Sequence, residues 1–180
     1  MKKSTQTLLG TLAVIFAMGT SNAAFAAKMK NIKTMTSPAL EKIAATYDYI
    51  VGGIDDTGVT KVSILEKKTT EKWEQTIKQM YRRNRYINEA DALIMRKSAS
   101  TIKKSFQSLI DGGGYLSHED EAIAELNKKV LPLILKAAAQ STIKFYNAGF
   151  SGEFDAAYGS FVFVDTDNNE ILSLDAGYSE

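Results

Sequence analysis

The tetrapeptide Ser-Thr-Ile-Lys occurs twice in this chain, at Ser100–Lys103 and at Ser141–Lys144. Each copy fits Ser-x-x-Lys, the nucleophile motif of penicillin-binding proteins and serine β-lactamases. The Ser-Asp-Asn and Lys-Thr-Gly motifs that accompany it in those enzymes do not occur in the sequence. The apolar periodicity also places both copies well inside helices, whereas the motif of those enzymes begins a helix. We therefore predict that neither serine is a nucleophile.

A second serine lies in Gly-Phe-Ser-Gly-Glu, residues 149–153, which resembles the nucleophile elbow Gly-x-Ser-x-Gly. Glu153 replaces the final glycine, and the order helix, then strands, is the reverse of what an elbow requires. The only histidine, His118, lies upstream, so a Ser-His-Asp triad is disfavoured. We interpret Gly149 and Gly152 as a hinge between a helix and a hairpin.

Two acidic stretches could bind metal. His118 precedes three acids that complement the start of a helix, although a histidine near a carboxylate could also act as an acid-base pair. Asp165, Asp167 and Asn169 have the spacing of a calcium loop, but its glycine and its final glutamate are missing. The favoured interpretations are a solvated helix start and a polar hairpin turn. We predict no catalytic residue, no metal and no cofactor.

A basic stretch interleaved with aromatic residues is the best candidate for a binding surface. Arg82, Arg83 and Arg85 lie between Tyr81 and Tyr86, and arginines flanked by aromatic rings suit an anionic partner. A solvated helix face is the alternative. A different candidate is a small-molecule pocket lined by aromatic side chains, with core packing as the alternative for each of them. Those aromatic residues are Trp73, Tyr47, Tyr49, Tyr115, Tyr146 and Tyr158.

The N-terminus has the three parts of a secretory signal peptide: Lys2 and Lys3, an apolar run, and small residues ending at Ala26. We predict cleavage after Ala26, with Ala23 as the alternative. The apolar run is shorter than the roughly 20 residues of a membrane-spanning helix. The expected location is the periplasm, with the extracellular medium as the alternative, and no transmembrane segment is expected after cleavage.

Composition predicts one domain, residues 27–180, after a signal peptide at residues 1–26. The chain has no cysteine, which excludes thiol catalysis, thiolate zinc sites and disulfides. Basic residues outnumber acidic ones from Lys28 to Lys104, and acidic residues outnumber basic ones from Ser105 to Glu180. Folding could turn this split into a bipolar surface or interleave the two halves.

The pattern of apolar residues predicts an α+β fold. Ser37 and Pro38 begin a short helix, and two β-prone runs around residues 55–58 predict a hairpin. A long helical region from Thr69 restarts after Asn88 and ends at three glycines, residues 112–114. A second helix capped by Ser117 runs to Phe145, with a kink near Leu131 caused by Pro132. A hairpin around residues 165–169 closes an antiparallel sheet of about four strands, packed on one face against two long helices and the short N-terminal helix.

These features predict a small exported binding protein without enzymatic activity. The expected partner is a protein or an anionic envelope component. The expected contact residues are Arg82, Arg83, Arg85, Tyr81, Tyr86 and Trp73. Because the protein is expected to be exported, we predict no intracellular nucleic-acid partner. The alternative is a ligand-binding or sensor-like domain with an aromatic pocket. A hydrolase that uses serine or carboxylates ranks third.

Overall fold

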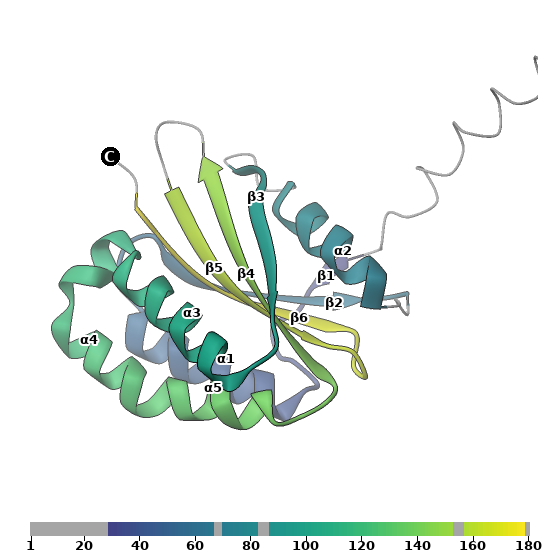
Figure 1. Cartoon of the computed structure of the whole chain (residues 1–180), viewed down its shortest axis with the longest axis horizontal. Helices are drawn as coiled ribbons and strands as arrows, with labels where there is room; N and C mark the ends of the chain where they lie inside the picture. Colours follow the sequence, from purple (N-terminus) through teal and green to yellow (C-terminus); the bar gives the residue numbers. More distant parts are fainter. Residues whose placement is uncertain (1–28, 67–69, 83–86, 153–156, 179–180) are drawn as a thin grey trace, which may run out of the picture.

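The computed structural model of the chain describes residues 29–66, 70–82, 87–152 and 157–178. These residues form an α+β fold around one antiparallel sheet, and helices cover both of its faces (Figure 1). The strands are β1 (Met29–Asn31), β2 (Thr57–Ile64), β3 (Ile87–Arg96), β4 (Ile143–Gly152), β5 (Ala157–Asp165) and β6 (Glu170–Tyr178). The helical segments are α1 (Pro38–Val51), α2 (Thr70–Arg82), α3 (Ala99–Asp111), the 3₁₀ turn η2 (Gly114–His118), α4 (Asp120–Glu125), the π-helical segment η3 (Leu126–Val130) and α5 (Leu131–Ala138).

The sheet has six strands in the order β1-β2-β6-β5-β4-β3, not the expected four or so. The hairpin expected at the end of the chain is confirmed, because β5 pairs with β6 from Asp165 opposite Glu170 onward. This hairpin lies in the middle of the sheet. Of its flanking strands, β4 directly precedes β5 in the chain, whereas β2 comes from the N-terminal half, so the pairing of β2 with β6 is long-range.

The two faces of the sheet carry separate apolar clusters because successive strand residues point to opposite sides. Phe161 and Phe163 belong to the larger cluster, which α1, α3 and α5 cover. Val162 and Val164 belong to the smaller cluster, which α2 covers. The expectation that all helices pack on one face is therefore wrong. Both faces of β5 are apolar, so helices must pack on each face to bury its side chains.

Helix α1 begins at Pro38, as the sequence predicts, with Ser37 at the N-cap position. The Ser37 side chain makes no hydrogen bond to the first helical amides. The buried Glu170 carboxylate instead accepts hydrogen bonds from the amides of Thr36 at 2.7 Å and Ser37 at 2.9 Å. Since Glu170 begins β6, this contact attaches the start of α1 to the centre of the sheet.

The first predicted hairpin does not form. Residues expected to make its first strand instead continue α1 as far as Val51. Strand β2 is present, but it pairs with β6 on one side and with β1 on the other. Tyr47 and Val51 are buried in the larger cluster, so packing of this helical face against the sheet outweighs the β propensity of the local sequence.

The long helix expected across residues 88–109 is a strand followed by a shorter helix. Residues 87–96 form β3, which pairs with β4, and α3 begins at Ala99. Ser98 caps α3 by accepting the amide of Thr101 at 3.2 Å. Local helix propensity in β3 is overridden by pairing with a neighbour about 50 residues away in the chain, a contact that periodicity cannot reveal. The helix ends at Gly112, as predicted.

The last predicted helix is shorter at both ends. It begins at Asp120, and Ser117 donates its hydroxyl hydrogen bond to the carbonyl of Gly114 instead of capping the helix. The irregularity expected near Leu131 is present as η3, where the amide of Leu131 bonds to the carbonyl of Leu126. The helix ends at Ala138, and β4 begins at Ile143 after a turn.

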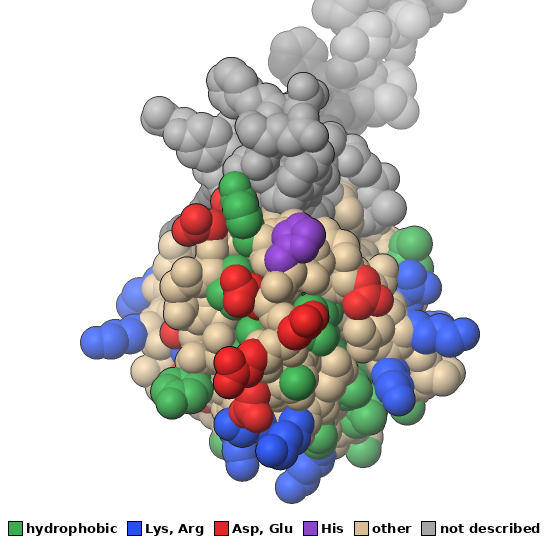
Figure 2. Space-filling model, turned by 90° about the vertical axis from the view of Figure 1, so that its left-hand side faces the viewer, with side chains coloured by type: hydrophobic (Ala, Val, Ile, Leu, Met, Phe, Trp, Pro, Cys, Tyr) green, Lys and Arg blue, Asp and Glu red, His purple; other side chains and the backbone are tan. Residues whose placement is uncertain are grey.

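The charge split along the chain survives in part at the surface. Figure 2 shows acidic side chains gathered around the histidine, with lysine and arginine side chains nearer the margins of this face. Glu119, Asp120 and Glu121 are exposed next to His118. One end of the molecule, at η2 and the start of α4, is therefore acidic.

Candidate functional site

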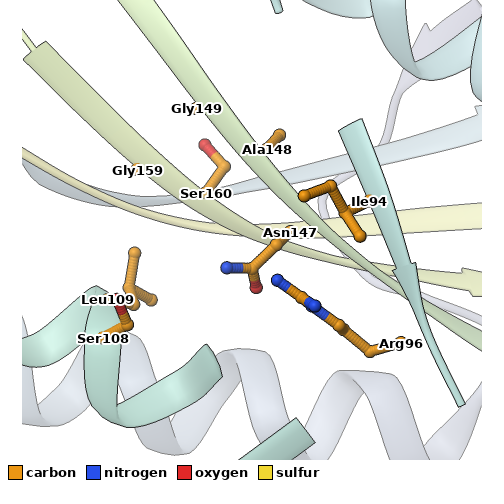
Figure 3. Close-up of a pocket in the computed structure, with 9 residues that line it drawn as sticks. All are labelled: Ile94, Arg96, Ser108, Leu109, Asn147, Ala148, Gly149, Gly159 and Ser160. Atoms are coloured by element: carbon orange, nitrogen blue, oxygen red, sulfur yellow. The ribbon is translucent and has the colours of Figure 1, made fainter. Parts of the chain in front are cut away.

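A pocket of about 220 Å³ lies between helix α3 and the adjacent face of β3, β4 and β5. Side chains from two layers of the fold meet there (Figure 3). The lining residues are Ile94, Arg96, Ser108, Leu109, Asn147, Ala148, Gly149, Gly159 and Ser160. The volume corresponds to about seven water molecules at ~30 Å³ each, so the pocket suits a small molecule or one end of a larger one.

The pocket exists because two glycines face each other across the sheet. Gly149 of β4 pairs with Gly159 of β5, and neither supplies a side chain to fill the space beneath α3. A β-carbon added at Gly149 would meet no atom within 4 Å, whereas one at Gly159 would lie 3.4 Å from Leu109 Cδ1. A glycine inside a strand often marks such a close approach or hollow.

Strand register brings two polar side chains to this hollow. Ile94 pairs with Asn147 and Arg96 with Phe145 across β3 and β4, so Ile94, Arg96 and Asn147 all point to the α3 side of the sheet. Figure 3 shows the Arg96 side chain extending toward the Asn147 carboxamide. The two polar groups therefore face the same small volume.

Each of the two polar groups has one buried atom without a partner. The Nε atom of Arg96 and the Oδ1 atom of Asn147 are buried and have no hydrogen-bond partner. Among the described residues no carboxylate pairs with Arg96. A buried polar atom without a partner costs roughly 1–3 kcal/mol, and native proteins rarely keep one without a reason. Two such atoms lie at this one pocket, where a bound molecule or water could satisfy both.

The chemistry of the pocket favours an anion with an apolar portion. The guanidinium of arginine matches the geometry of a carboxylate or phosphate and stays charged at all ordinary pH values. Asn147 can accept a hydrogen bond from a ligand donor. Ile94 and Leu109 supply apolar contact, and the exposed Ser108 hydroxyl lies on the α3 side.

Trp73 and Tyr81, two of the residues that the sequence predicted for binding, do not line this pocket. Trp73 is fully buried and Tyr81 is 6% exposed, both in the apolar cluster beneath α2. Arg82 is the last residue of α2. Arg83, Arg85 and Tyr86 lie outside the described residues, so the proposed basic patch is not assembled by the part of the chain that the structure describes.

The aromatic residues considered for a pocket do not surround one. Tyr47 and Tyr146 are fully buried in different clusters, on opposite faces of the sheet. Burial, together with the charge of Glu74, raises the pKa of Tyr146 to about 12. Tyr49 and Tyr115 are exposed, and the side chain of Tyr158 lies outside the described residues. Core packing therefore accounts for Trp73, Tyr47 and Tyr146.

Both Ser-Thr-Ile-Lys copies occupy places that the sequence did not predict. Ser100 lies in the first turn of α3, and its hydroxyl hydrogen-bonds with the Ser98 hydroxyl at 3.1 Å. Ser141 lies in the turn before β4, where its carbonyl accepts a hydrogen bond from Lys144 at 3.3 Å. The argument that both copies lie well inside helices is wrong, because the first copy begins α3 and the second spans a turn and the start of β4. Both serines are exposed.

The remaining motifs form turns and strands. Gly149 and Gly152 belong to β4 and are not a hinge between a helix and a hairpin. Asp165 accepts hydrogen bonds from the amides of Asp167 at 3.0 Å and Asn168 at 3.1 Å, which makes the β5–β6 connection a polar turn. No group of His, Asp or Glu side chains among the described residues is arranged to hold a metal ion.

Sequence reasoning missed Arg96 and Asn147 because it placed Arg96 in a helix and Asn147 just after the end of another. The available signal was a glycine in each of two β-rich runs, Asn-Ala-Gly-Phe and Tyr-Gly-Ser-Phe. Only the pairing of Gly149 with Gly159 turns these into a hollow, and only the register of β3 directs Arg96 toward it.

The sequence matches no protein-family model, and no curated protein matches it either. Within the described residues, no helix has both the length and the apolar character needed to cross a membrane.

Proposed function

We propose that this protein is an exported binding protein that holds a small anionic molecule in the pocket beneath α3. The observation that carries the proposal is the pair of buried, unpartnered polar atoms, Arg96 Nε and Asn147 Oδ1, at a hollow left by Gly149 and Gly159. An anionic group of the ligand would pair with Arg96, and a ligand donor would bond to Asn147. This is a ligand-binding function, and export follows from the predicted signal peptide.

Burial makes the arginine a useful anchor. A charge-assisted hydrogen bond contributes about 1.5–3 kcal/mol, more than a bond between neutral groups. The pocket holds apolar surface from Ile94 and Leu109 next to this charge, so a carboxylate attached to a short hydrocarbon chain fits better than a bare inorganic ion. Butyrate is a simple probe of this chemistry.

The test is an NMR titration of the full exported chain with sodium butyrate, with sodium chloride at equal ionic strength as the reference. We expect saturable shifts of the amides of Arg96, Asn147, Gly149 and Gly159. The Arg96→Gln variant should bind butyrate about 10-fold to 100-fold more weakly, since it loses a charge-assisted bond. Gly149→Val should weaken binding as well, because its side chain fills the pocket.

The matched control is Lys97→Gln, which removes one positive charge from the exposed residue next to Arg96. It should bind butyrate with nearly the affinity of the wild-type protein. If Lys97→Gln and Arg96→Gln lost the same affinity for butyrate, the loss would be explained by the net charge of the protein and not by the pocket. Unchanged binding in Arg96→Gln would reject the pocket. Native mass spectrometry of the gently purified protein tests the same site for a retained ligand.

The basic stretch at residues 82–85 is a separate hypothesis, in which a protein partner or an anionic envelope component contacts the end of α2. It rests on the sequence alone, because its arginine side chains lie outside the described residues. Charge reversal at Arg82, Arg83 and Arg85 should weaken recovery of a partner from envelope extract. Unchanged recovery would reject this patch and leave the α3 pocket unaffected.

A further inference from the structure

A second polar cluster lies on the opposite face of the sheet from the α3 pocket. It consists of Thr60 from β2, Ser160 from β5, Ser173 and Asp175 from β6, and Tyr81 from α2. Cross-strand pairing places these residues together: Thr60 is opposite Ser173, and Asp175 is opposite Ser160. The cluster adjoins the apolar side chains beneath α2, which include Trp73 and Val162.

Three hydroxyl groups converge on one oxygen of the Asp175 carboxyl group. Oδ1 accepts hydrogen bonds from Ser160 at 2.5 Å, from Ser173 at 2.6 Å and from Tyr81 at 3.4 Å. The Tyr81 hydroxyl also hydrogen-bonds with the Ser173 hydroxyl. These contacts come from three elements, β5, β6 and α2, and they fix the orientation of the carboxyl group.

The second carboxyl oxygen of Asp175, Oδ2, accepts fewer hydrogen bonds than Oδ1. Oδ2 of Asp175 has one hydrogen-bond donor, the Thr60 hydroxyl at 3.4 Å. The residue paired with Asp175 on β2 is Gly58, which supplies no side chain, and a β-carbon placed there would meet no atom within 4 Å. Asp175 is partly exposed. Open space therefore borders the carboxyl group on its β2 side.

Among the described residues, no side chain supplies this carboxyl group with a positive charge. Its hydrogen-bond donors are all neutral hydroxyls, and no lysine, arginine or histidine among the described residues forms an ion pair with it. Removing a carboxylate from water without a countercharge is unfavourable. Consistent with this, burial raises the pKa of Asp175 above its ordinary value although the hydroxyl donors oppose the shift.

We propose that Asp175 anchors a second binding site, on the α2 face of the sheet, for a ligand that carries an alkylammonium group. The ammonium group would occupy the open space over Gly58 and donate to Asp175 Oδ2 and Thr60. It would supply the countercharge that the surrounding hydroxyls cannot. The Asp175 and Arg96 side chains lie on opposite faces of the sheet, and Ser160, which bonds to Asp175, also lines the α3 pocket.

The experiment is an NMR titration of the full exported chain with methylammonium chloride, with sodium chloride as the reference salt. We expect saturable amide shifts at Gly58, Thr60 and Asp175, and none at Arg96 or Gly149. The Asp175→Asn variant keeps the shape of the side chain and one acceptor oxygen for Ser160 and Ser173, but it loses the charge and has an NH2 donor in place of Oδ2. It should bind methylammonium about tenfold more weakly or not at all.

Two further variants keep the proposal open to contradiction. Asp167→Asn removes an equal charge from an exposed turn residue and should bind as the wild type does. Gly58→Val fills the open space and leaves Asp175 unchanged, so it should weaken binding even if Asp175→Asn fails to fold. Methylammonium shifts that persist in both Asp175→Asn and Gly58→Val would falsify the site, as would the absence of saturable shifts in the wild type.

Methanol is the control titrant, because it carries a hydroxyl group and no charge. It should give no saturable shifts, and saturation by methanol would show that the site takes a neutral hydroxyl ligand instead.

Discussion

At the scale of single residues, the most informative groups are polar side chains placed where the fold does not fully satisfy them. Among the described residues, Arg96 Nε and Asn147 Oδ1 have no partner on the α3 face, and Asp175 has no countercharge on the α2 face. Glu170 is a contrast, since its buried carboxylate accepts two backbone amides at the start of α1. The satisfied carboxylate holds the structure together, and the unsatisfied groups are the candidates for function.

The raised pKa of Asp175 predicts how stability changes with pH. A carboxyl group whose pKa is higher in the folded state favours folding while it is protonated, and this contribution is lost as pH rises from about 3.8 through the folded pKa. Asp175→Asn cannot ionise. The free energy of unfolding of the variant, minus that of the wild type, should therefore increase with pH across this window.

Urea unfolding of both proteins between about pH 3 and pH 8 measures this difference. The titratable side chains at Asp175 are Tyr81, which donates to the carboxyl group, and Tyr47, which donates to the Asp175 carbonyl at 3.2 Å. Burial raises the pKa of both tyrosines further above this range. Burial also tends to raise the pKa of Glu41, but its bonds to Lys61 and Met35 outweigh this and lower it. The contribution of Glu41 to stability is the same in the wild type and in Asp175→Asn, so it cancels in the difference between their free energies of unfolding. A difference that stays flat or falls with pH would contradict the prediction.

At the scale of elements, α3 is held against the sheet at its C-terminal end by a close backbone approach. A β-carbon at Gly113 would lie 2.9 Å from both the Ala176 β-carbon and the Leu109 carbonyl oxygen. Gly113→Ala must therefore push the end of α3 away from β6. We expect it to lower the free energy of unfolding by about 1–3 kcal/mol.

Gly58→Ala is the matched control, because a β-carbon there meets no atom within 4 Å. Its free energy of unfolding should stay within about 0.5 kcal/mol of the wild-type value. Chemical denaturation of the three proteins gives the comparison directly. Equal stability of Gly113→Ala and Gly58→Ala would show that α3 does not depend on this approach. Because Leu109 also lines the α3 pocket, Gly113→Ala should weaken butyrate binding too.

Helices and strands differ in whether local sequence signals predict them. The β5–β6 hairpin and helix α1 were predictable because their signals are local: a polar turn between two apolar runs, and Pro38 at a helix start. Strand β3 was not, because its residues also suit a helix. Its pairing with β4 decides the outcome, and α3 and α5 lie between these two strands in the sequence.

At the scale of the whole molecule, one sheet carries two cores. Phe161 contacts Phe106, Phe145 and Phe163 on the α3 face, while the only tryptophan, Trp73, is buried on the α2 face. Since β5 contributes to both clusters, the two faces should unfold together. Trp73 fluorescence then reports on changes made at the opposite face.

Phe161→Ala should lower the free energy of unfolding by about 3–5 kcal/mol, because it leaves a cavity in the larger core. The urea midpoint followed by Trp73 fluorescence should fall as far as the midpoint followed by circular dichroism. Tyr49→Ala, which changes an exposed side chain of α1, is the control and should leave both midpoints nearly unchanged. Separate fluorescence and dichroism transitions would show that the two faces fold independently.

The sequence by itself determined the α+β class, the closing hairpin, the start of α1, the end of α3 and the absence of cysteine chemistry. Each of these depends on composition or on residues close together in the chain. The tertiary structure alone decided the six-stranded order, the placement of α2 on its own face, and both candidate sites. Arg96, Asn147 and the two glycines come from three strands, as do Thr60, Ser160 and Asp175. Their meeting is set by strand register, which depends on how distant segments bury their apolar faces, and no local pattern encodes that.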